Sequence, residues 1–211
     1  EWDCPHMPWD ETRLCVRDLA SGEVTVIAGG AGESVCQPRW RADGALTFIS
    51  DRTGWWNLYE LPHGRGEVKA LVEVEGEIGL PQWVFGLSRY GVLGDGRIAF
   101  ACKRNGFDSL AVRLADGQVA ELDLPFVDVR CVRAAGEDAF VAIAASVDAD
   151  TSIVRVNLGE GAQVRSVETL RPGRRLGDLG IPRSYLSLPQ AVDLPSAAGR
   201  TAHALLYRPA N

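Results

Sequence analysis

Residues 38–61 read PRWRADGALTFISDRTGWWNLYEL, and this stretch contains the unit from which the fold can be inferred. It opens with Pro-x-Trp, turns at Asp43–Gly44 and continues as the apolar run ALTFIS (45–50). The polar turn DRTG (51–54) then leads into the alternating run WWNLYEL (55–61). Because Asp-Gly favours tight hairpin turns and alternation indicates strands, the stretch predicts neighbouring antiparallel strands.

The same order of features recurs at residues 81–114, PQWVFGLSRYGVLGDGRIAFACKRNGFDSLAVRL. That segment also opens with Pro-x-Trp, and it contains Asp-Gly, the run RIAFAC, the polar turn KRNG and a second alternating run. Residues 129–158 keep this rhythm without the tryptophan, and residues 12–19 match its last run alone. A further strand-like segment follows each copy, so the unit holds four short strands. A period of about 40–50 residues with four strands per unit is typical of a β-propeller.

We therefore predict an all-β fold: a partial β-propeller of about three full four-stranded blades and a half blade. The expected divisions are a partial blade at 1–30 and blades at 31–75, 76–124 and 125–170. Stacked blades bury the faces that a single sheet would expose. No segment shows the 3.6-residue period over the length of a helix, so an α/β fold has little support.

The first residues, EWD (1–3), match the end of a second strand, so the half blade lacks its first two strands. The chain also lacks a methionine at position 1, and Met7 is its only one. It therefore resembles the later part of a longer propeller. Since an open ring leaves blade faces and edges uncovered, assembly into a homo-oligomer is one expected way of covering them.

The blade rhythm ends near residue 170. Residues 171–183 are polar and rich in glycine and proline, and they predict a linker. Residues 184–211 hold two alternating runs, YLSLPQAVDL and TAHALLYRP, joined by PSAAGR. This pattern predicts a C-terminal β-hairpin outside the propeller.

Composition excludes several classes of function. The formal net charge is −6 and no long run of lysine or arginine occurs, so no nucleic-acid partner is expected. No window approaches 18 apolar residues, and the N-terminus lacks the basic start and apolar core of a signal peptide. No membrane association is therefore expected.

The five cysteines are odd in number and form no Cys-x-x-Cys motif. They predict free thiols in a reducing compartment, and hence a cytoplasmic protein. The segment CPH (4–6) has no partner pair at zinc-site spacing, so neither a metal nor another cofactor is expected.

The blade unit resembles that of TolB-type and prolyl-oligopeptidase-type propellers, in which Pro-x-Trp-x-x-Asp-Gly leads to Ser-Asp-Arg-x-Gly and Asn-Leu-Tyr. Three further segments, MPWDETRLCVRDL, GLPQWVFGLSRY and YLSLPQAVDLPSAAGRTAHALLYRPAN, are similar to bacterial members of the prolyl oligopeptidase family. These relatives are dipeptidyl-peptidases and acylaminoacyl-peptidases. The resemblance covers nearly the whole chain.

That resemblance implies a serine peptidase that hydrolyses short peptides or releases N-terminal residues. Its Ser-His-Asp triad lies in a C-terminal α/β-hydrolase domain, which the final hairpin would precede and which this sequence lacks. The propeller would cap and gate the active site, so the expected partners are short peptides and the chain's own hydrolase domain. The alternative is a TolB-like propeller that serves as a protein-binding scaffold.

The chain itself offers no convincing triad. Ser88, in GLSRYG, has Tyr90 where a nucleophile elbow needs its second glycine, and it is interpreted as a loop serine. His6, His63 and His203 have no acid and serine at a suggestive spacing. No catalytic residue is therefore predicted.

Two residues are candidates for substrate binding, Glu77 and Trp83. Glu73, Glu75 and Glu77 precede Pro-x-Trp at a blade entrance, where a solvated loop is the simpler interpretation. By analogy with the family, whose propeller in some members supplies acidic groups, Glu77 would face the central cavity and pair with a substrate ammonium group.

The paired tryptophans, Trp55 and Trp56, are interpreted as architecture. Two-residue alternation places Trp55 and Tyr59 on one face of a strand and Trp56 and Leu58 on the other. A blade has neighbours on both faces, so large apolar groups are expected on both.

Overall fold

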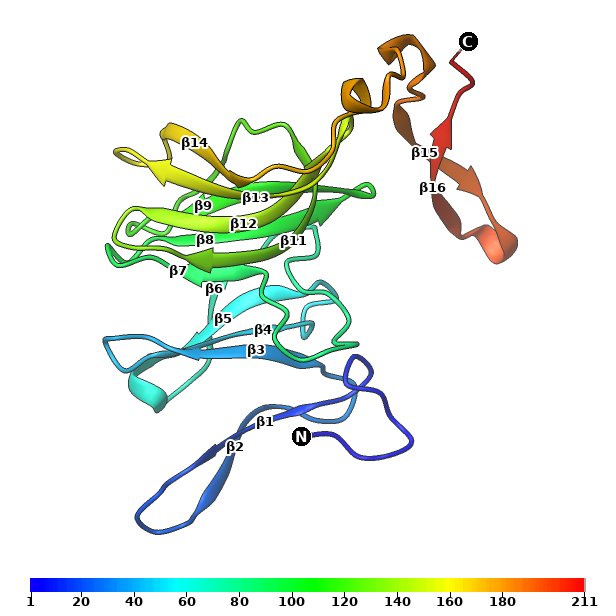
Figure 1. Ribbon diagram of the computed structural model, residues 1–211. Coiled ribbons are helices and arrows are strands. Elements are labelled where there is room, and N and C mark those ends of the chain that lie inside the picture. Colours follow the sequence, from blue (N-terminus) through cyan, green and yellow to red (C-terminus); the bar gives the residue numbers. More distant parts are fainter. Residues whose placement is uncertain (211) are drawn as a thin grey trace.

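The structure is a computed structural model that describes residues 1–210. Its sheets are antiparallel, and three of them have four strands each (Figure 1). Two further sheets have two strands each, one at either end of the chain. The predicted all-β fold, with three full blades, a half blade and a terminal hairpin, is confirmed.

The strands follow the chain order within each sheet. The half blade consists of β1 (Arg13–Arg17) and β2 (Val24–Gly29). The first blade consists of β3 (Val35–Trp40), β4 (Leu46–Ser50), β5 (Asn57–Leu61) and β6 (Lys69–Val72). The second consists of β7 (Tyr90–Val92), β8 (Ile98–Arg104), β9 (Phe107–Arg113) and β10 (Val119–Glu121). The third consists of β11 (Phe126–Ala134), β12 (Ala139–Ser146), β13 (Ala149–Leu158) and β14 (Val164–Arg171).

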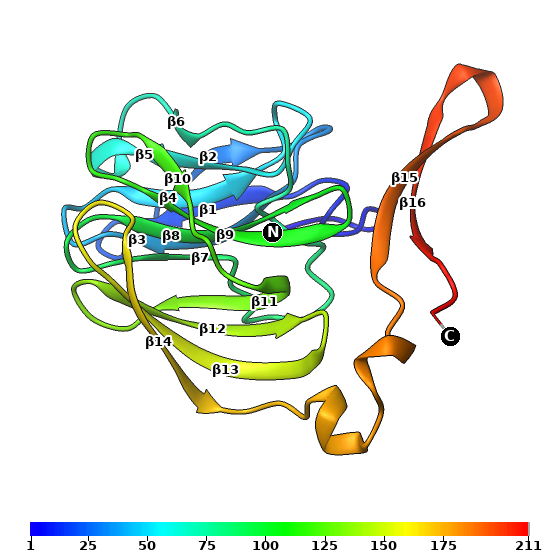
Figure 2. The same cartoon turned by 90° about the horizontal axis from the view of Figure 1, so that it is seen from above.

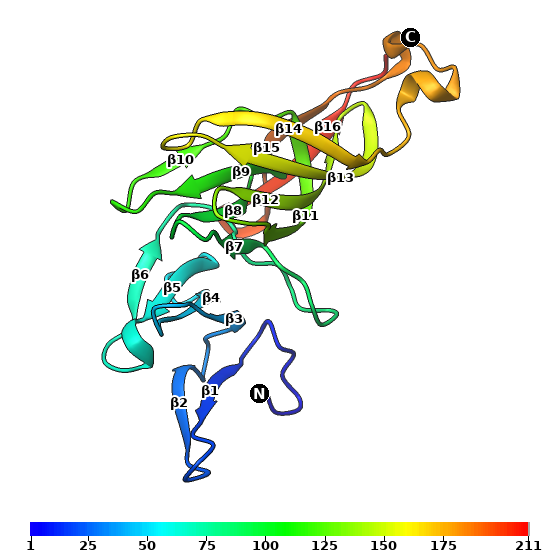
Figure 3. The ribbon, with the colours of Figure 1, turned by 60° about the vertical axis from the view of Figure 1, so that its left-hand side comes forward.

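The blades succeed one another in space as they do in sequence, from the half blade to the third blade (Figures 1 and 3). A buried apolar cluster fills each gap. Leu14, Phe48 and Tyr59 belong to the cluster between the half blade and the first blade. Leu58 and Phe100 belong to the cluster between the first and second blades. The third cluster joins the second and third blades.

Strand β5 shows why the repeat decides the fold. Leu58 and the half-buried Trp56 pack on the cluster shared with the second blade. Tyr59 and Leu61 pack on the cluster shared with the half blade. The predicted alternation of faces is therefore confirmed within the strand. Trp55 precedes the strand and is 41% exposed, so the anchoring tryptophan of the pair is Trp56.

The N-terminal residue completes part of the half blade. The backbone nitrogen of Glu1 donates to the Arg13 carbonyl and the Arg13 N–H donates to the Glu1 carbonyl, both at 2.8 Å. Glu1 thus pairs with β1 in the place expected for the end of a second strand.

One feature of the predicted repeat is wrong. Pro38 and Trp40 lie in β3, but Pro81 and Trp83 lie in an irregular loop, and the second blade begins at Tyr90. The two Pro-x-Trp motifs are therefore not structurally equivalent. We call residues 79–89 the β6–β7 loop.

Beyond the third blade, the chain forms two short 3₁₀ helices, η2 (Leu176–Leu179) and η3 (Arg183–Tyr185). The terminal hairpin follows, with β15 (Pro189–Pro195) and β16 (Thr201–Tyr207) joined through η4 (Ala197–Gly199). It stands to one side of the blades (Figure 2). The remaining 3₁₀ helix, η1 (Pro62–Gly64), turns between β5 and β6.

Candidate functional site: an aromatic cavity

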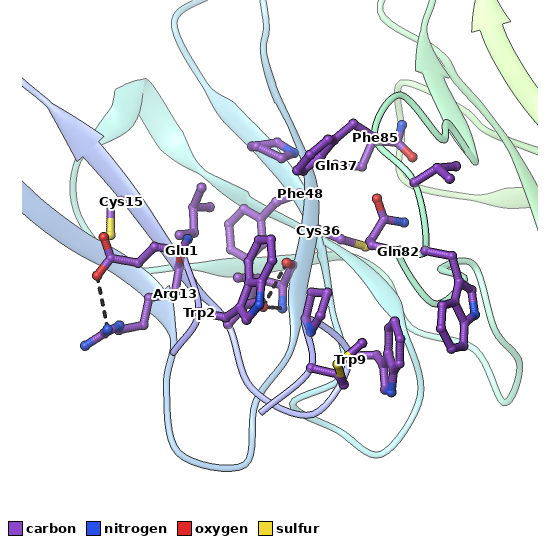
Figure 4. A pocket seen from close by; sticks show the side chains of 18 residues that line it. Glu1, Trp2, Trp9, Arg13, Cys15, Cys36, Gln37, Phe48, Gln82 and Phe85 are labelled. Atoms are coloured by element: carbon purple, nitrogen blue, oxygen red, sulfur yellow. Dashed lines mark hydrogen bonds and ion pairs between the residues drawn. The ribbon is translucent and has the colours of Figure 1, made fainter. Parts of the chain in front are cut away.

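A cavity of about 670 Å³ lies between the half blade, the first blade and the β6–β7 loop (Figure 4). Leu14 of β1 and Val35 of β3 line it together with Phe48 of β4, all from the apolar cluster between the two sheets. The N-terminal loop contributes Trp9, and the β6–β7 loop contributes residues 82–85. The cavity is therefore assembled from segments that lie far apart in the sequence.

Trp83 lies at the rim of this cavity. Its ring centroid is 4.3 Å from that of Trp9, with 44° between the ring planes, and its side chain is nevertheless 73% exposed. Close contact between aromatic rings that are offset or tilted is favourable. The contact holds an exposed ring in a defined orientation, which suits Trp83 to ligand contact. The substrate-binding role predicted for it remains a prediction.

The β6–β7 loop is fixed at both ends. Near its start, the N–H groups of Ile78 and Gly79 donate to the Trp56 carbonyl, at 2.8 Å and 3.3 Å. Near its end, the Gly86 carbonyl accepts a hydrogen bond from the Arg133 guanidinium at 2.9 Å. Gly86 has φ = 85°, a conformation that favours glycine. Hydrogen bonds near both ends of the loop therefore fix the position of its tip.

Glu77 does not line the cavity that Trp83 lines. One of its carboxylate oxygens accepts the Trp56 backbone N–H at 2.9 Å, and its backbone pairs with Lys103. The structure therefore gives Glu77 the task of holding the start of β5, and it does not bring the two sequence candidates into one site. A role for Glu77 in binding an ammonium group stays a prediction.

The charged groups of the cavity balance one another. Among its lining residues only Glu1 and Arg13 carry acidic or basic side chains, and their charged groups are 3.1 Å apart. Arg13 also pairs with Asp3 at 2.5 Å. The lining therefore presents no unpaired cation or carboxylate at this point.

The buried thiol in the lining of the cavity, Cys36, is not a nucleophile. All five cysteines are free, and Cys15 and Cys36 line the cavity. Burial, together with the nearby Asp51 carboxylate, raises the pKa of Cys36 to about 12. Because the thiolate is the reactive form, Cys36 is inert at neutral pH.

Ser88 lies near the end of the β6–β7 loop, as its sequence context suggested, but it is not exposed to solvent. It is fully buried, its hydroxyl donates to the Val132 carbonyl at 2.7 Å, and it accepts a hydrogen bond from the Gln37 amide at 3.2 Å. It also forms a bridge with Cys131 of β11. Ser88 therefore ties three blades together, and it is no exposed nucleophile.

The Ser88→Ala substitution should lower the free energy of unfolding by about 1–3 kcal/mol, because the Gln37 amide and the Val132 carbonyl lose a buried partner. Urea denaturation followed by tryptophan fluorescence measures the change. Ser196→Ala, in the exposed turn of the terminal hairpin, is the control. Equal stabilities of the two variants would contradict the assigned role.

None of the three histidines lines the cavity. The His203 Nδ1 atom is 2.7 Å from the Asp193 carboxylate on the exposed hairpin, and His6 and His63 are exposed. Within residues 1–210, no group of three or more metal-ligating side chains gathers as a metal site would require. No helix in the same residues is long and apolar enough to cross a membrane.

Comparison with known proteins extends this description. No model of a known protein family matches the sequence, and no curated protein matches it either. Among solved structures, the chain is similar to a puromycin-hydrolyzing peptidase from Mycobacterium tuberculosis, with a TM-score of 0.84 and 31% identity. The match covers 100% of this chain and 32% of that one, so this chain spans about a third of that peptidase.

Two more distant structures show the same fold. Prolyl oligopeptidase B from Galerina marginata has a TM-score of 0.68 at 10% identity, covering 93% of this chain and 27% of its own. TolB from Acinetobacter baumannii has a TM-score of 0.54 at 18% identity, covering 96% and 44%. The expected resemblance to the prolyl oligopeptidase family is confirmed. The chain is a partial β-propeller of the kind found in the peptidases of that family.

Proposed function

We propose that this chain is the non-catalytic propeller module of a serine peptidase that acts on short peptides or releases N-terminal residues. In this role it caps and gates the active site of an α/β-hydrolase domain on the same polypeptide. One observation carries the proposal: the whole chain aligns at 31% identity with about a third of a peptidase. The cytoplasmic location predicted from the cysteines belongs to the same proposal.

The placement of the cavity supports a gating role. The N-terminal loop, the β6–β7 loop and the terminal hairpin lie at the same end of the blades (Figures 1 and 2). The hairpin contacts this end through Leu205, which lies beside Gly106 in the turn between β8 and β9. A domain docked beside the hairpin would therefore face the aromatic cavity.

The isolated 211-residue chain is expected to show no hydrolysis of aminoacyl or dipeptidyl chromogenic substrates, because it lacks a triad. The longer encoded polypeptide, with a downstream Gly-x-Ser-x-Gly segment, should hydrolyse them and lose activity with a serine-directed reagent. Serine-reagent-sensitive hydrolysis by the isolated chain would refute the non-catalytic assignment.

A TolB-like scaffold is the second candidate, favoured by the similarity of fold to TolB. The coding sequence distinguishes the two functions. A stop codon directly after Asn211 favours the scaffold, whereas a downstream Gly-x-Ser-x-Gly with later aspartate and histidine favours the peptidase.

A further inference from the structure

The tip of the β6–β7 loop exposes three consecutive apolar side chains. Trp83 is 73% exposed, Val84 60% and Phe85 92%. Exposed apolar surface that is contiguous and borders a concavity marks a binding site more often than scattered apolar residues do. Since the base of this loop is hydrogen-bonded to the first and third blades, the tip does not simply collapse onto the core.

The cavity beneath this tip has the size and the lining of a small-ligand site. Its volume of about 670 Å³ falls within the range of roughly 300–1,000 Å³ that is typical of such sites. Aromatic rings come from three separate segments: Trp2 and Trp9 at the N-terminus, Phe48 in β4, and Trp83 with Phe85 in the loop. An aromatic ligand group could therefore contact rings on several sides.

Charge narrows the class of ligand. Glu1 and Arg13 neutralise one another, and the remaining described lining residues are apolar or uncharged. A charged ligand group entering this space would lose hydration without gaining an unpaired opposite charge, which is costly. An uncharged apolar or aromatic group gains the burial of its surface without that cost.

We infer that this cavity binds an uncharged, bulky apolar or aromatic side chain of a peptide. That this ligand is a substrate rests on the proposed peptidase function. In that peptidase, the cavity selects substrates by the same apolar or aromatic side chain. Trp83 and Phe85 contact the bound group, and Trp9 positions the Trp83 ring.

The test uses the 211-residue chain and N-acetyl-4-fluorophenylalaninamide, whose binding is followed by ¹⁹F NMR titration. We expect saturable binding that N-acetyl-tryptophanamide and N-acetyl-leucinamide displace. The amides of N-acetyl-lysine and N-acetyl-glutamate should not displace it. Absence of saturable binding to the wild-type chain, or equal displacement by the lysine amide, overturns the inference.

Trp83→Ala should weaken binding of the fluorinated amide about tenfold, as expected for loss of one aromatic contact at the rim of the cavity. Trp40→Ala is the matched control, since Trp40 is also exposed, at 59%, and lies outside the cavity. Far-UV circular dichroism checks that both variants fold. If Trp83→Ala does not fold, Phe85→Ala replaces it in the titration. Equal affinities of the Trp83 or Phe85 variant and the Trp40 variant would contradict the assignment.

The outcome separates the cavity from the proposed function. If the chain binds the probe but the longer polypeptide hydrolyses no peptide, the cavity assignment stands and the peptidase proposal falls. If the longer polypeptide is an active peptidase but the chain binds no probe, the peptidase proposal stands and the cavity assignment falls.

Discussion

Replacing Arg89 with alanine is expected to lower the free energy of unfolding by about 3–5 kcal/mol. The Arg89 and Asp108 side chains are each 1% exposed, and their charged groups are 2.7 Å apart. Arg89 also donates to the carbonyls of Ile78 and Val129, while Asp108 accepts the Val129 N–H at 2.8 Å. Removing the guanidinium leaves a buried carboxylate with only Lys103, at 3.2 Å, to balance it.

Urea denaturation monitored by circular dichroism measures this effect. Arg165→Ala is the control, because the Arg165–Asp138 pair is exposed and such pairs contribute about 0–1 kcal/mol. Replacing both members of the buried pair, as Arg89→Met with Asp108→Leu, should recover much of the loss. If Arg89→Ala costs no more than Arg165→Ala, the pair does not hold the second and third blades together.

The same variant should show a changed dependence of stability on pH. Burial by itself raises the pKa of Asp108, but the hydrogen bond and charge of Arg89, together with the Val129 N–H and the charge of Lys103, outweigh it and hold the pKa below its usual value. The pair's contribution is therefore present above the unfolded pKa of about 3.9 and is lost as pH falls through the lower folded value. Without Arg89, the largest of the contributions that lower the pKa of Asp108 is lost while burial still raises it, so the variant retains less of this pH-dependent stabilisation. The difference in the free energy of unfolding between wild type and variant should therefore shrink as the pH is lowered below about 4.

The blades could be predicted from the sequence because their signals are local. In residues 45–61, alternation and turn chemistry determine strand, turn and strand without reference to the rest of the chain. The burial of Leu58 on one face and Tyr59 on the other follows from the two-residue period alone. Repetition of that pattern then gave the number of blades.

The contacts between blades could not be predicted in this way. Nothing near Ser88 or Arg89 indicates burial, since both are polar residues that follow a Gly-containing loop. They are buried because β11, about forty residues further on, supplies the carbonyls of Val132 and Val129. Trp83 misled for the same reason: its Pro-x-Trp motif matches that of Trp40, but the chain forms a loop there.

The candidate site, too, could be predicted only where a local sequence pattern indicated it. Trp83 was singled out by its motif, and the structure places it at the cavity rim. Its partner Trp9 is more than seventy residues away, and no local pattern links the two. Glu77 was a candidate because it belongs to an acidic cluster, yet its carboxylate accepts a hydrogen bond from the Trp56 N–H. A backbone partner of this kind has no signature in sequence.

Truncating Phe140 to alanine is expected to cost about 3–5 kcal/mol of stability. Its ring is fully buried in β12, in the cluster that joins the second and third blades and includes Leu110 and Val154. Removing the ring creates a void that β-strands pinned on both sides cannot easily fill. Differential scanning calorimetry and urea denaturation measure the loss.

Phe85→Ala is the matched control for this substitution, because it removes the same side chain from a position that is 92% exposed. Its effect on stability should stay within about 0.5 kcal/mol. Similar losses in the two variants would mean that Phe140 is not a core residue or that Phe85 is not free of the fold. If only Phe140 matters for stability, the exposed Phe85 side chain contributes little to the fold, as expected of a side chain that contacts a ligand.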